Sequence, residues 1–147
     1  MRPATPVALL AVVAALSGCG GGGNAASYPE LQRQAAAICL RYHRGLAKLG
    51  APSTLPRLAK VAQGAHRLGA QERAALERLD PPADARESLA RMIDGFRRAD
   101  ALLPSVSRAA RAKKIATART IARRGRAIVK RANRDAVALG LADCRRS

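Results

Sequence analysis

The chain has 147 residues, a length that suits a single domain. Hydrophobic residues make up 48% of it, but 34 of them are alanine, and aromatic residues make up only 2%. Alanine favours helices and fills little volume, whereas strands favour aromatic and β-branched residues. The composition therefore predicts an all-α fold with a thin core and argues against a β-sheet protein. The 27 Lys and Arg against 10 Asp and Glu give a formal net charge of +17, which excludes an acidic scaffold.

The first residues follow the pattern of an export signal. Arg2 supplies a positive charge, and residues 7–16 (VALLAVVAAL) form an apolar run of ten. Ten helical residues span about 15 Å, half of a bilayer core, so the run suits a signal peptide rather than a membrane-spanning helix. The tetrad Leu16-Ser17-Gly18-Cys19 follows this run. This arrangement resembles the lipobox of bacterial lipoproteins, with Cys19 at the position that carries the lipid.

The resemblance implies that residues 1–18 are a signal peptide that is removed, and that a diacylglyceryl group is attached to the sulfur of Cys19. Two or three acyl chains hold a protein stably on a membrane. We therefore expect a lipid-anchored protein on the extracytoplasmic face of the cell membrane, with residues 19–27 as lipidated Cys and Gly-rich tether. The alternative is an ordinary cleaved secretory signal with a cysteine near its end.

Residues 28–147 carry the spacing of a helical domain. Ser27 and Glu30 have the spacing of a capping box, and apolar residues then recur at steps of three and four up to Leu49. A second helix follows Ser53-Thr54 and ends before residues 80–82 (DPP). Its predicted inner side is Leu55, Leu58, Ala62, Ala65, Leu68, Glu72, Leu76 and Leu79.

Two more helices are expected in the second half. The third begins near Ala83, and Pro104 either kinks it or ends it. The fourth runs from about Lys113 to Leu139, with Gly140 as its C-cap and an apolar residue after it, as in a Schellman motif. Its predicted inner side is Ala118, Ile121, Ala122, Gly125, Ile128, Val129, Ala132, Ala136 and Leu139. Four amphipathic helices with short links predict an up-down-up-down four-helix bundle.

If Cys19 carries lipid, Cys39 and Cys144 remain. An exported domain meets an oxidising compartment, where an even pair of cysteines usually bonds. The first and last helices of an up-down bundle are neighbours, so we expect a disulfide between Cys39 and Cys144, worth about 4 to 5 kcal/mol in the chain-entropy model. A buried free thiol or an intermolecular link is the alternative.

Three features of this layout occur together: Cys39 in the first helix, a turn at residues 79–82 (LDPP), and the terminal sequence GLADC at residues 140–144. In these features the chain is similar to a set of small two-cysteine helical lipoproteins of high-GC bacteria. The resemblance implies a helical fold and no particular activity.

Few residues suit catalysis or metal binding. His43 and His66 are the only histidines, and Cys39 and His43, four residues apart, are a possible pair of metal ligands. A zinc site needs three or four ligands, and no further Cys or His is free if Cys39 bonds Cys144. The motifs for haem attachment and for a di-iron bundle do not occur. We therefore expect no metal, no cofactor and no enzymatic activity.

The strongest anomaly is a basic segment. Residues 101–134 contain eleven Lys and Arg and no Asp or Glu. On a helix at 100° per residue, its basic side chains form a stripe and a neighbouring ridge opposite the apolar side. The candidate anion-binding residues are Arg119, Arg123, Arg124, Arg126, Lys130, Arg131 and Arg134.

Several interpretations of this segment stay open. It is a plain solvated surface if the 22 Arg against 5 Lys reflect a high-GC genome. It is a binding surface if it associates with anionic phospholipid or a cell-wall polymer, because basic residues near an anionic leaflet contribute about 1 kcal/mol each. An acidic protein partner would use the same arginines. Nucleic acid is disfavoured, since single-strand binding uses stacked aromatic residues, which are scarce here.

Overall fold

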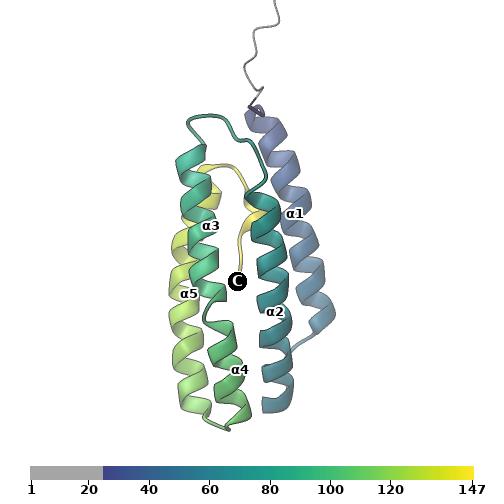
Figure 1. Cartoon of the computed structure of the whole chain (residues 1–147), viewed down its shortest axis with the longest axis vertical. Coiled ribbons are helices and arrows are strands. Elements are labelled where there is room, and N and C mark those ends of the chain that lie inside the picture. The colour runs from purple at the N-terminus through teal and green to yellow at the C-terminus, as the bar shows by residue number, and fades with distance from the viewer. Residues whose placement is uncertain (1–24) are drawn as a thin grey trace, which may run out of the picture.

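The computed structural model describes residues 25–147, and every regular element in that range is a helix. The chain forms an all-α bundle, as predicted, closed by the predicted disulfide between Cys39 and Cys144 (Figure 1). The elements are α1 (Tyr28–Leu49), α2 (Leu55–Leu76), α3 (Arg86–Asp100), α4 (Leu103–Arg111), α5 (Ile115–Ala138) and a short 3₁₀-helix, η1 (Ala142–Cys144).

The helix ends follow the local chemistry of the sequence. Ser27 accepts a hydrogen bond from the backbone N–H of Glu30, and Thr54 caps α2 in the same way. After α5, Gly140 adopts a φ of 69°, a left-handed conformation that glycine allows without steric cost. The backbone N–H of Gly140 then donates to Val137, and that of Leu141 donates to Ala136. These two bonds form the predicted Schellman motif.

Pro104 neither kinks the third predicted helix nor lies at its end. The helix ends at Asp100, and Pro104 lies in the first turn of a separate helix, α4. The first turn suits proline because its missing N–H would have no partner there. Two other predicted bounds also differ, since α2 ends at Leu76 and α3 begins at Arg86.

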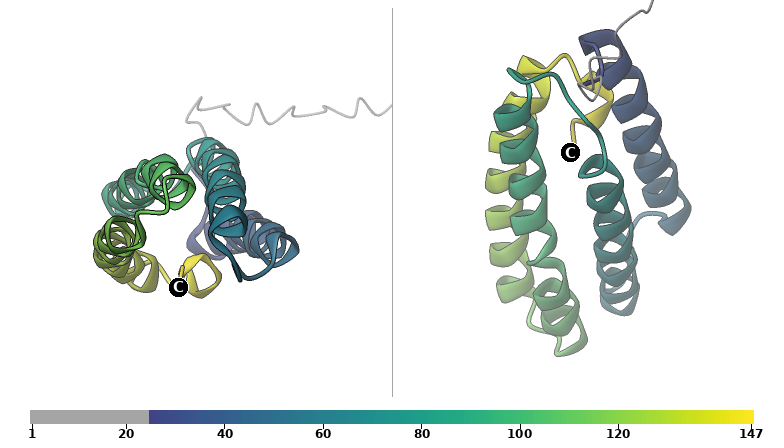
Figure 2. Two further views of the ribbon diagram at one scale, coloured as in Figure 1. Left: turned by 90° about the horizontal axis from the view of Figure 1, so that it is seen from below. Right: turned by 45° about the horizontal axis from the view of Figure 1, so that its top comes forward.

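α3 and α4 follow one another along one line and act as a single rod, so the bundle has four rods (Figures 1 and 2). Successive rods run in opposite directions, which fits the up-down-up-down order. The main interfaces join α3 with α5, α2 with α4, and α1 with α2.

The bundle is not closed by α1 against α5. Within the described chain these two helices form no interface of their own, and η1 contacts both of them. Figure 2 shows the C-terminal segment lying between them. The expectation that the first and last helices are direct neighbours is therefore wrong, although the disulfide that it suggested is present.

The larger core side chains gather at one end of the bundle. Leu31, Leu76, Met92 and Phe96 are fully buried there, near the disulfide. At this end α3 and α5 pack closely, because a Cβ atom at Gly95 would lie only 2.7 Å from the Cβ of Ala132. The other end is thinner, and its buried hydrophobic residues are mostly alanine: Ala59, Ala62, Val106, Ala109, Ala110 and Ala118.

The predicted inner side of α5 is only partly buried. Ala118, Ala132, Ala136 and Leu139 are buried, as expected. The residues between them in the middle of the helix are half-buried: Ile121, Ala122, Gly125, Ile128 and Val129. The reason is that, in the described chain, α1 and α5 form no interface of their own, so no helix covers this part of α5.

The expected signal peptide, Cys19 and the glycines of the tether lie outside the described residues. Within residues 25–147, no helix combines the length and hydropathy needed to cross a bilayer.

Candidate functional site

Two long stretches of the bundle carry no acidic residue. The basic segment 101–134 covers the link from α3 into α4, all of α4 and most of α5. Residues 43–71, from the end of α1 and most of α2, also contain no Asp or Glu. Because α4 packs on both α2 and α5, the fold brings most of these two stretches to the same end, and the last turns of α5 continue beside α3, where Ala132 faces Gly95. We call residues 43–71 and 101–134 the acid-free half.

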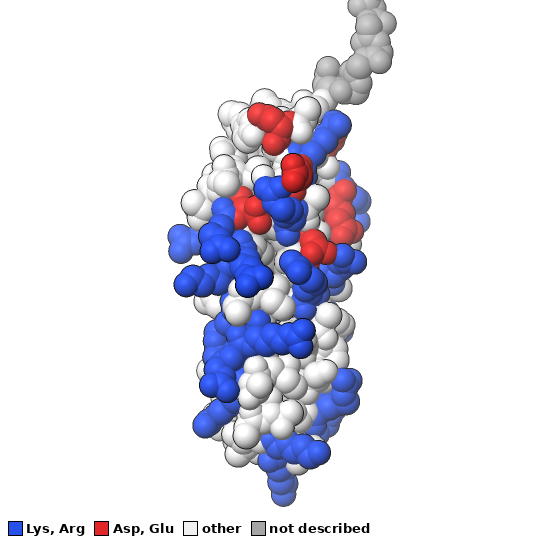
Figure 3. Space-filling model, turned by 90° about the vertical axis from the view of Figure 1, so that its left-hand side faces the viewer, with Lys and Arg blue, Asp and Glu red and all other residues white. Residues whose placement is uncertain are grey.

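The acid-free half is strongly cationic. It holds sixteen Lys and Arg residues, five in residues 43–71 and eleven in residues 101–134. In the described part of the chain, none of the sixteen forms an ion pair. Figure 3 shows the side formed by α3, α4 and α5, where acidic atoms occur only in the part nearer the start of the described chain and basic atoms extend along the whole length. The seven residues predicted from the sequence are all exposed on α5: Arg119, Arg123, Arg124, Arg126, Lys130, Arg131 and Arg134.

Sequence reasoning missed the contribution of α1 and α2. Arg44, Lys48, Arg57, Lys60 and Arg67 belong to the same half, and all five are exposed. A signal was present, since no acidic residue occurs from residue 31 to residue 71. The link between the two acid-free stretches is a tertiary one, and the sequence pattern alone does not contain it.

The other half contains the acidic residues, and most of its arginines are paired. Arg91 donates to Asp135 (Nε–Oδ1, 3.1 Å), and Arg97 and Arg98 both pair with Asp94. The hydrogen bond from Arg97 lowers the pKa of Asp94, with the charges of both arginines adding to it. The positive charge is therefore largely compensated in this half and uncompensated in the acid-free half.

An apolar cavity of about 330 Å³ opens within the acid-free half. It is lined by all four rods and by the last residues of the C-terminal segment. Its walls are aliphatic in the main, including Leu46, Leu58, Val61, Leu103 and Ile121. Three charged residues also line it: Asp100, Arg126 and Arg146. Its volume lies at the lower end of the range of small-molecule sites.

A buried charge cluster closes the inner end of this cavity. The guanidinium of Arg146 pairs with Glu72 and, at 2.8 Å, with Asp100, and Asp100 also pairs with Arg73. The same guanidinium lies between two rings, 4.3 Å from the centre of Tyr42 and 4.0 Å from that of Phe96. Such stacking suits arginine, whose planar group is weakly hydrated.

Burial and charge compete in this cluster. Burial raises the pKa of Glu72, against the opposite effect of the neighbouring Arg146. Burial also raises the pKa of Tyr42 to about 12. Burial alone would lower the pKa of Arg146, but the attraction of Glu72, Tyr42 and Asp100 outweighs it and the pKa is raised. Arg146 therefore stays charged, and it compensates the carboxylates that surround it.

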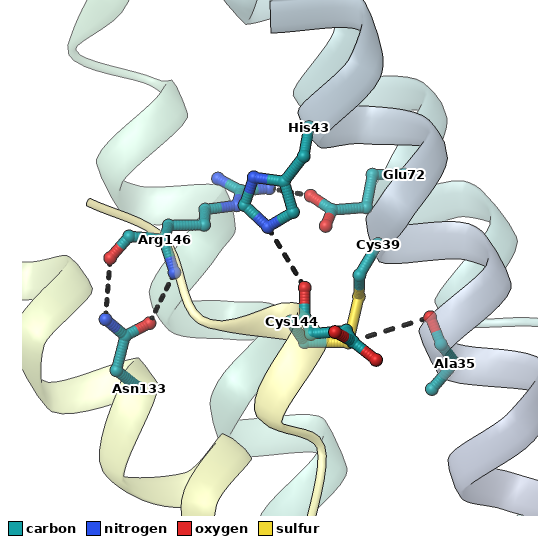
Figure 4. Close-up of a disulfide and its surroundings, with 8 residues drawn as sticks. Ala35, Cys39, His43, Glu72, Asn133, Cys144 and Arg146 are labelled. Carbon is teal, nitrogen blue, oxygen red and sulfur yellow. Dashed lines mark hydrogen bonds and ion pairs between the residues drawn. A yellow bond between two sulfur atoms is a disulfide. The ribbon is translucent and has the colours of Figure 1, made fainter.

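Three sets of contacts hold the C-terminal segment that carries Arg146 (Figure 4). The disulfide joins Cys144 to Cys39 of α1, with Cα atoms 4.9 Å apart. Asn133 of α5 bonds the backbone of Arg146 twice, at 2.7 and 3.0 Å. The Nε2 atom of His43 lies 3.0 Å from the carbonyl oxygen of Asp143. These contacts hold the segment between α1 and α5.

The same contacts involve Cys39 and His43, the possible pair of metal ligands. Cys39 is bonded to Cys144, so its sulfur has no free thiolate to offer a metal. His66, the other histidine, has Nδ1 3.0 Å from the carbonyl oxygen of Asp100. Within residues 25–147 there is no group of three or more His, Cys, Asp or Glu residues that could hold a metal ion.

Comparison with known proteins adds no relative, because the chain matches no protein-family model, no curated protein and no solved structure.

Proposed function

We propose that this protein is a lipid-anchored, non-catalytic component of a bacterial cell envelope whose acid-free half binds an anionic envelope polymer. The observation that carries the proposal is the meeting of two acid-free stretches, remote in sequence, at one end of the bundle. Sixteen exposed or partly exposed cations without ion-pair partners create a field that attracts polyanions.

The anchor part of the proposal rests on the lipobox-like tetrad that ends at Cys19. The disulfide supports it, because such bonds persist in oxidising compartments outside the cytoplasm. Labelling of growing cells with radioactive palmitate tests it. The wild-type protein takes up label in the membrane fraction, and Cys19→Ser does not. A wild-type protein without label, found in the cytoplasm, contradicts the anchor.

The direction of the bundle favours a polymer over the headgroups beneath the anchor. The described chain begins at the end that carries the acidic residues, and most of the acid-free half lies toward the other end (Figures 1 and 3). α1 has 22 residues and is about 33 Å long. This length is about four Debye lengths at physiological salt, where exposed charges are screened beyond about 8 Å. An upright bundle therefore presents most of its unpaired cations away from the membrane.

The aromatic residues disfavour nucleic acid as the polymer. Tyr42 and Phe96 are buried, and both stack on Arg146. Tyr28 lies at the other end of the bundle, outside the acid-free half. The cationic surface therefore lacks the stacking side chains by which proteins hold single strands. Binding of a phosphate-bearing or carboxylate-bearing wall polymer requires only the positive charge of this surface.

The test compares two variants that each lose four positive charges. The first replaces Arg119, Arg123, Arg126 and Lys130 with Gln in the acid-free half. The control replaces Arg33, Arg41, Arg78 and Arg86 with Gln in the other half. We expect the wild type and the control to sediment with purified wall material at low salt, and the first variant to stay in solution. Equal retention of both variants contradicts the proposal.

Anionic vesicles form a second arm of the same test. A bundle lying on its side would bring α5 to the headgroups, and the wild type would then bind vesicles as well as wall material. Binding that falls steeply with salt and ignores the kind of polyanion supports the polymer proposal. Saturable binding to one protein that survives moderate salt points to an acidic protein partner and contradicts it.

A further inference from the structure

The apolar cavity of the acid-free half has the features of a ligand site rather than of a packing defect. Its lining includes the large side chains of Leu46, Leu58, Val61 and Ile121, which are only half-buried. A bundle of this type normally buries such residues against the opposite helix. Here the described C-terminal segment covers only the inner end of the gap between α1 and α5, where Arg146 and Ser147 line the cavity.

The wall that α5 contributes is hollowed by small residues. A Cβ atom placed on Gly125 would meet only one atom, Cδ1 of Leu102, at 3.8 Å. Ala122, one turn away, is equally small and lines the same cavity. Glycine in mid-helix costs about 1 kcal/mol relative to alanine. The position thus combines open space with a residue that weakens its helix.

The two ends of the cavity differ in charge. At the inner end, Arg146 is neutralised by Glu72 and Asp100, so this end offers no free cation. At the rim, Arg126 lines the cavity and also shares a surface depression with Arg119 and Arg123. An occupant with an apolar chain and an anionic head would therefore place its chain inside and its head at Arg126.

We propose that this cavity binds a single-chain anionic amphiphile, with the acyl chain among the aliphatic side chains and the head group at Arg126. A second copy of the bundle is a poor occupant, because two acid-free halves with sixteen cations each would repel one another. The site shares Arg126 with the proposed polymer-binding surface, but it differs from that surface because it depends on shape as well as on charge.

The test uses residues 25–147, which contain all the described helices and both cysteines of the disulfide, with helical content verified by circular dichroism. Dansyl-undecanoate serves as a fluorescent probe. We expect saturable binding of one probe per bundle, displaced by laurate, by lysophosphatidylglycerol, or by both. Displacement by only one of them identifies a fatty acid or a lysophospholipid as the preferred source. Dodecanol, which lacks the charge, should displace the probe about tenfold less well, the value of one charge-assisted contact.

Two substitutions on α5 distinguish probe binding in the cavity from probe binding to the outer surface. Gly125→Leu fills the cavity and should abolish probe binding, while it raises the melting temperature or leaves it unchanged. Ala127→Leu adds similar bulk on the exposed side of the same helix and should bind the probe as the wild type does. Arg126→Gln should weaken binding about tenfold.

Retention on wall material distinguishes this proposal from the previous one. Gly125→Leu keeps every charge, so it should sediment with wall material like the wild type while failing to bind the probe. Lack of saturable probe binding by the folded wild type overturns the cavity proposal and leaves the polymer proposal standing. Undiminished binding by Gly125→Leu also overturns it, as does a wild type that binds the probe only as a dimer.

Discussion

Nη1 of Arg146 lies 2.8 Å from Oδ1 of Asp100, the residue at which α3 ends. This contact joins the C-terminal segment to the point where the third rod changes from α3 to α4. Glu72 of α2 binds the same guanidinium. Arg146 is therefore part of the core of the bundle, and it connects the C-terminal segment to α2 and α3.

Replacing Arg146 with Met should destabilise the bundle by about 3 to 5 kcal/mol. The substitution leaves Glu72 and Asp100 buried with one fewer compensating charge, the costly outcome for a buried ion pair. The free energy of unfolding is measured by urea denaturation followed by far-ultraviolet circular dichroism. Arg145→Met is the matched control, because Arg145 is exposed, and it should change stability by less than about 0.5 kcal/mol.

A second substitution checks the cause of that loss. Glu72→Gln in the Arg146→Met background should recover part of the lost stability, because it removes one of the unpaired carboxylates. If the double variant is less stable than Arg146→Met alone, the account of the cluster as a compensated charge set is wrong.

Several helix ends and the disulfide were predictable from the sequence, whereas the buried cluster was not. Ser27, Thr54 and Gly140 act through neighbours in the sequence, so local chemistry determines their structure. Arg146 is seventy-four residues from Glu72, and its place in the core depends on packing that only the folded chain creates. One sign was present, because Glu72 falls on the otherwise apolar side of its helix.

The cavity escaped prediction for a related reason. Helical periodicity correctly placed Ile121, Gly125 and Val129 on the inner side of α5. It does not say whether a facing helix exists, and here α1 and α5 form no interface. Periodicity thus predicts which side of a helix is apolar, while the closing of the bundle decides whether that side is buried.

Reduction of the disulfide should lower stability by about 4 to 5 kcal/mol, since it encloses a sequence separation of 105 residues. Urea midpoints with and without dithiothreitol measure this loss. The disulfide and Arg146 hold the same segment, so their effects should not add: reduction of Arg146→Met should cost less than reduction of the wild type. Full additivity would contradict a shared role.

The raised pKa of Tyr42 should make the folded chain less stable at alkaline pH. Its pKa is raised from 10.0 to about 12 in the folded chain, chiefly by burial. Below pH 10 this contribution is fully present. Between these two pKa values the unfolded chain has lost the proton and the folded chain has kept it, so stability falls by about 1.4 kcal/mol per pH unit. Tyr42→Phe should reduce this slope, and an unchanged slope would contradict the burial of the hydroxyl.

Two glycine-to-alanine substitutions should have opposite signs. Gly95→Ala puts a methyl group 2.7 Å from the Cβ of Ala132 and should destabilise by about 1 to 3 kcal/mol. Gly125→Ala adds its methyl in open space and should stabilise by up to about 1 kcal/mol through helix propensity. Thermal unfolding measures both. Shifts of the same sign would contradict either the close contact of α3 with α5 or the cavity.

The most direct test of the anion-binding half is a residue-by-residue map. Poly(glycerol phosphate), a phosphate polymer, is titrated into isotopically labelled residues 25–147, and amide NMR shifts are followed at low and at moderate salt. The account predicts changes concentrated in residues 43–71 and 101–134, reversed as salt rises. Changes centred on residues 80–100, or none in a folded protein, would contradict it.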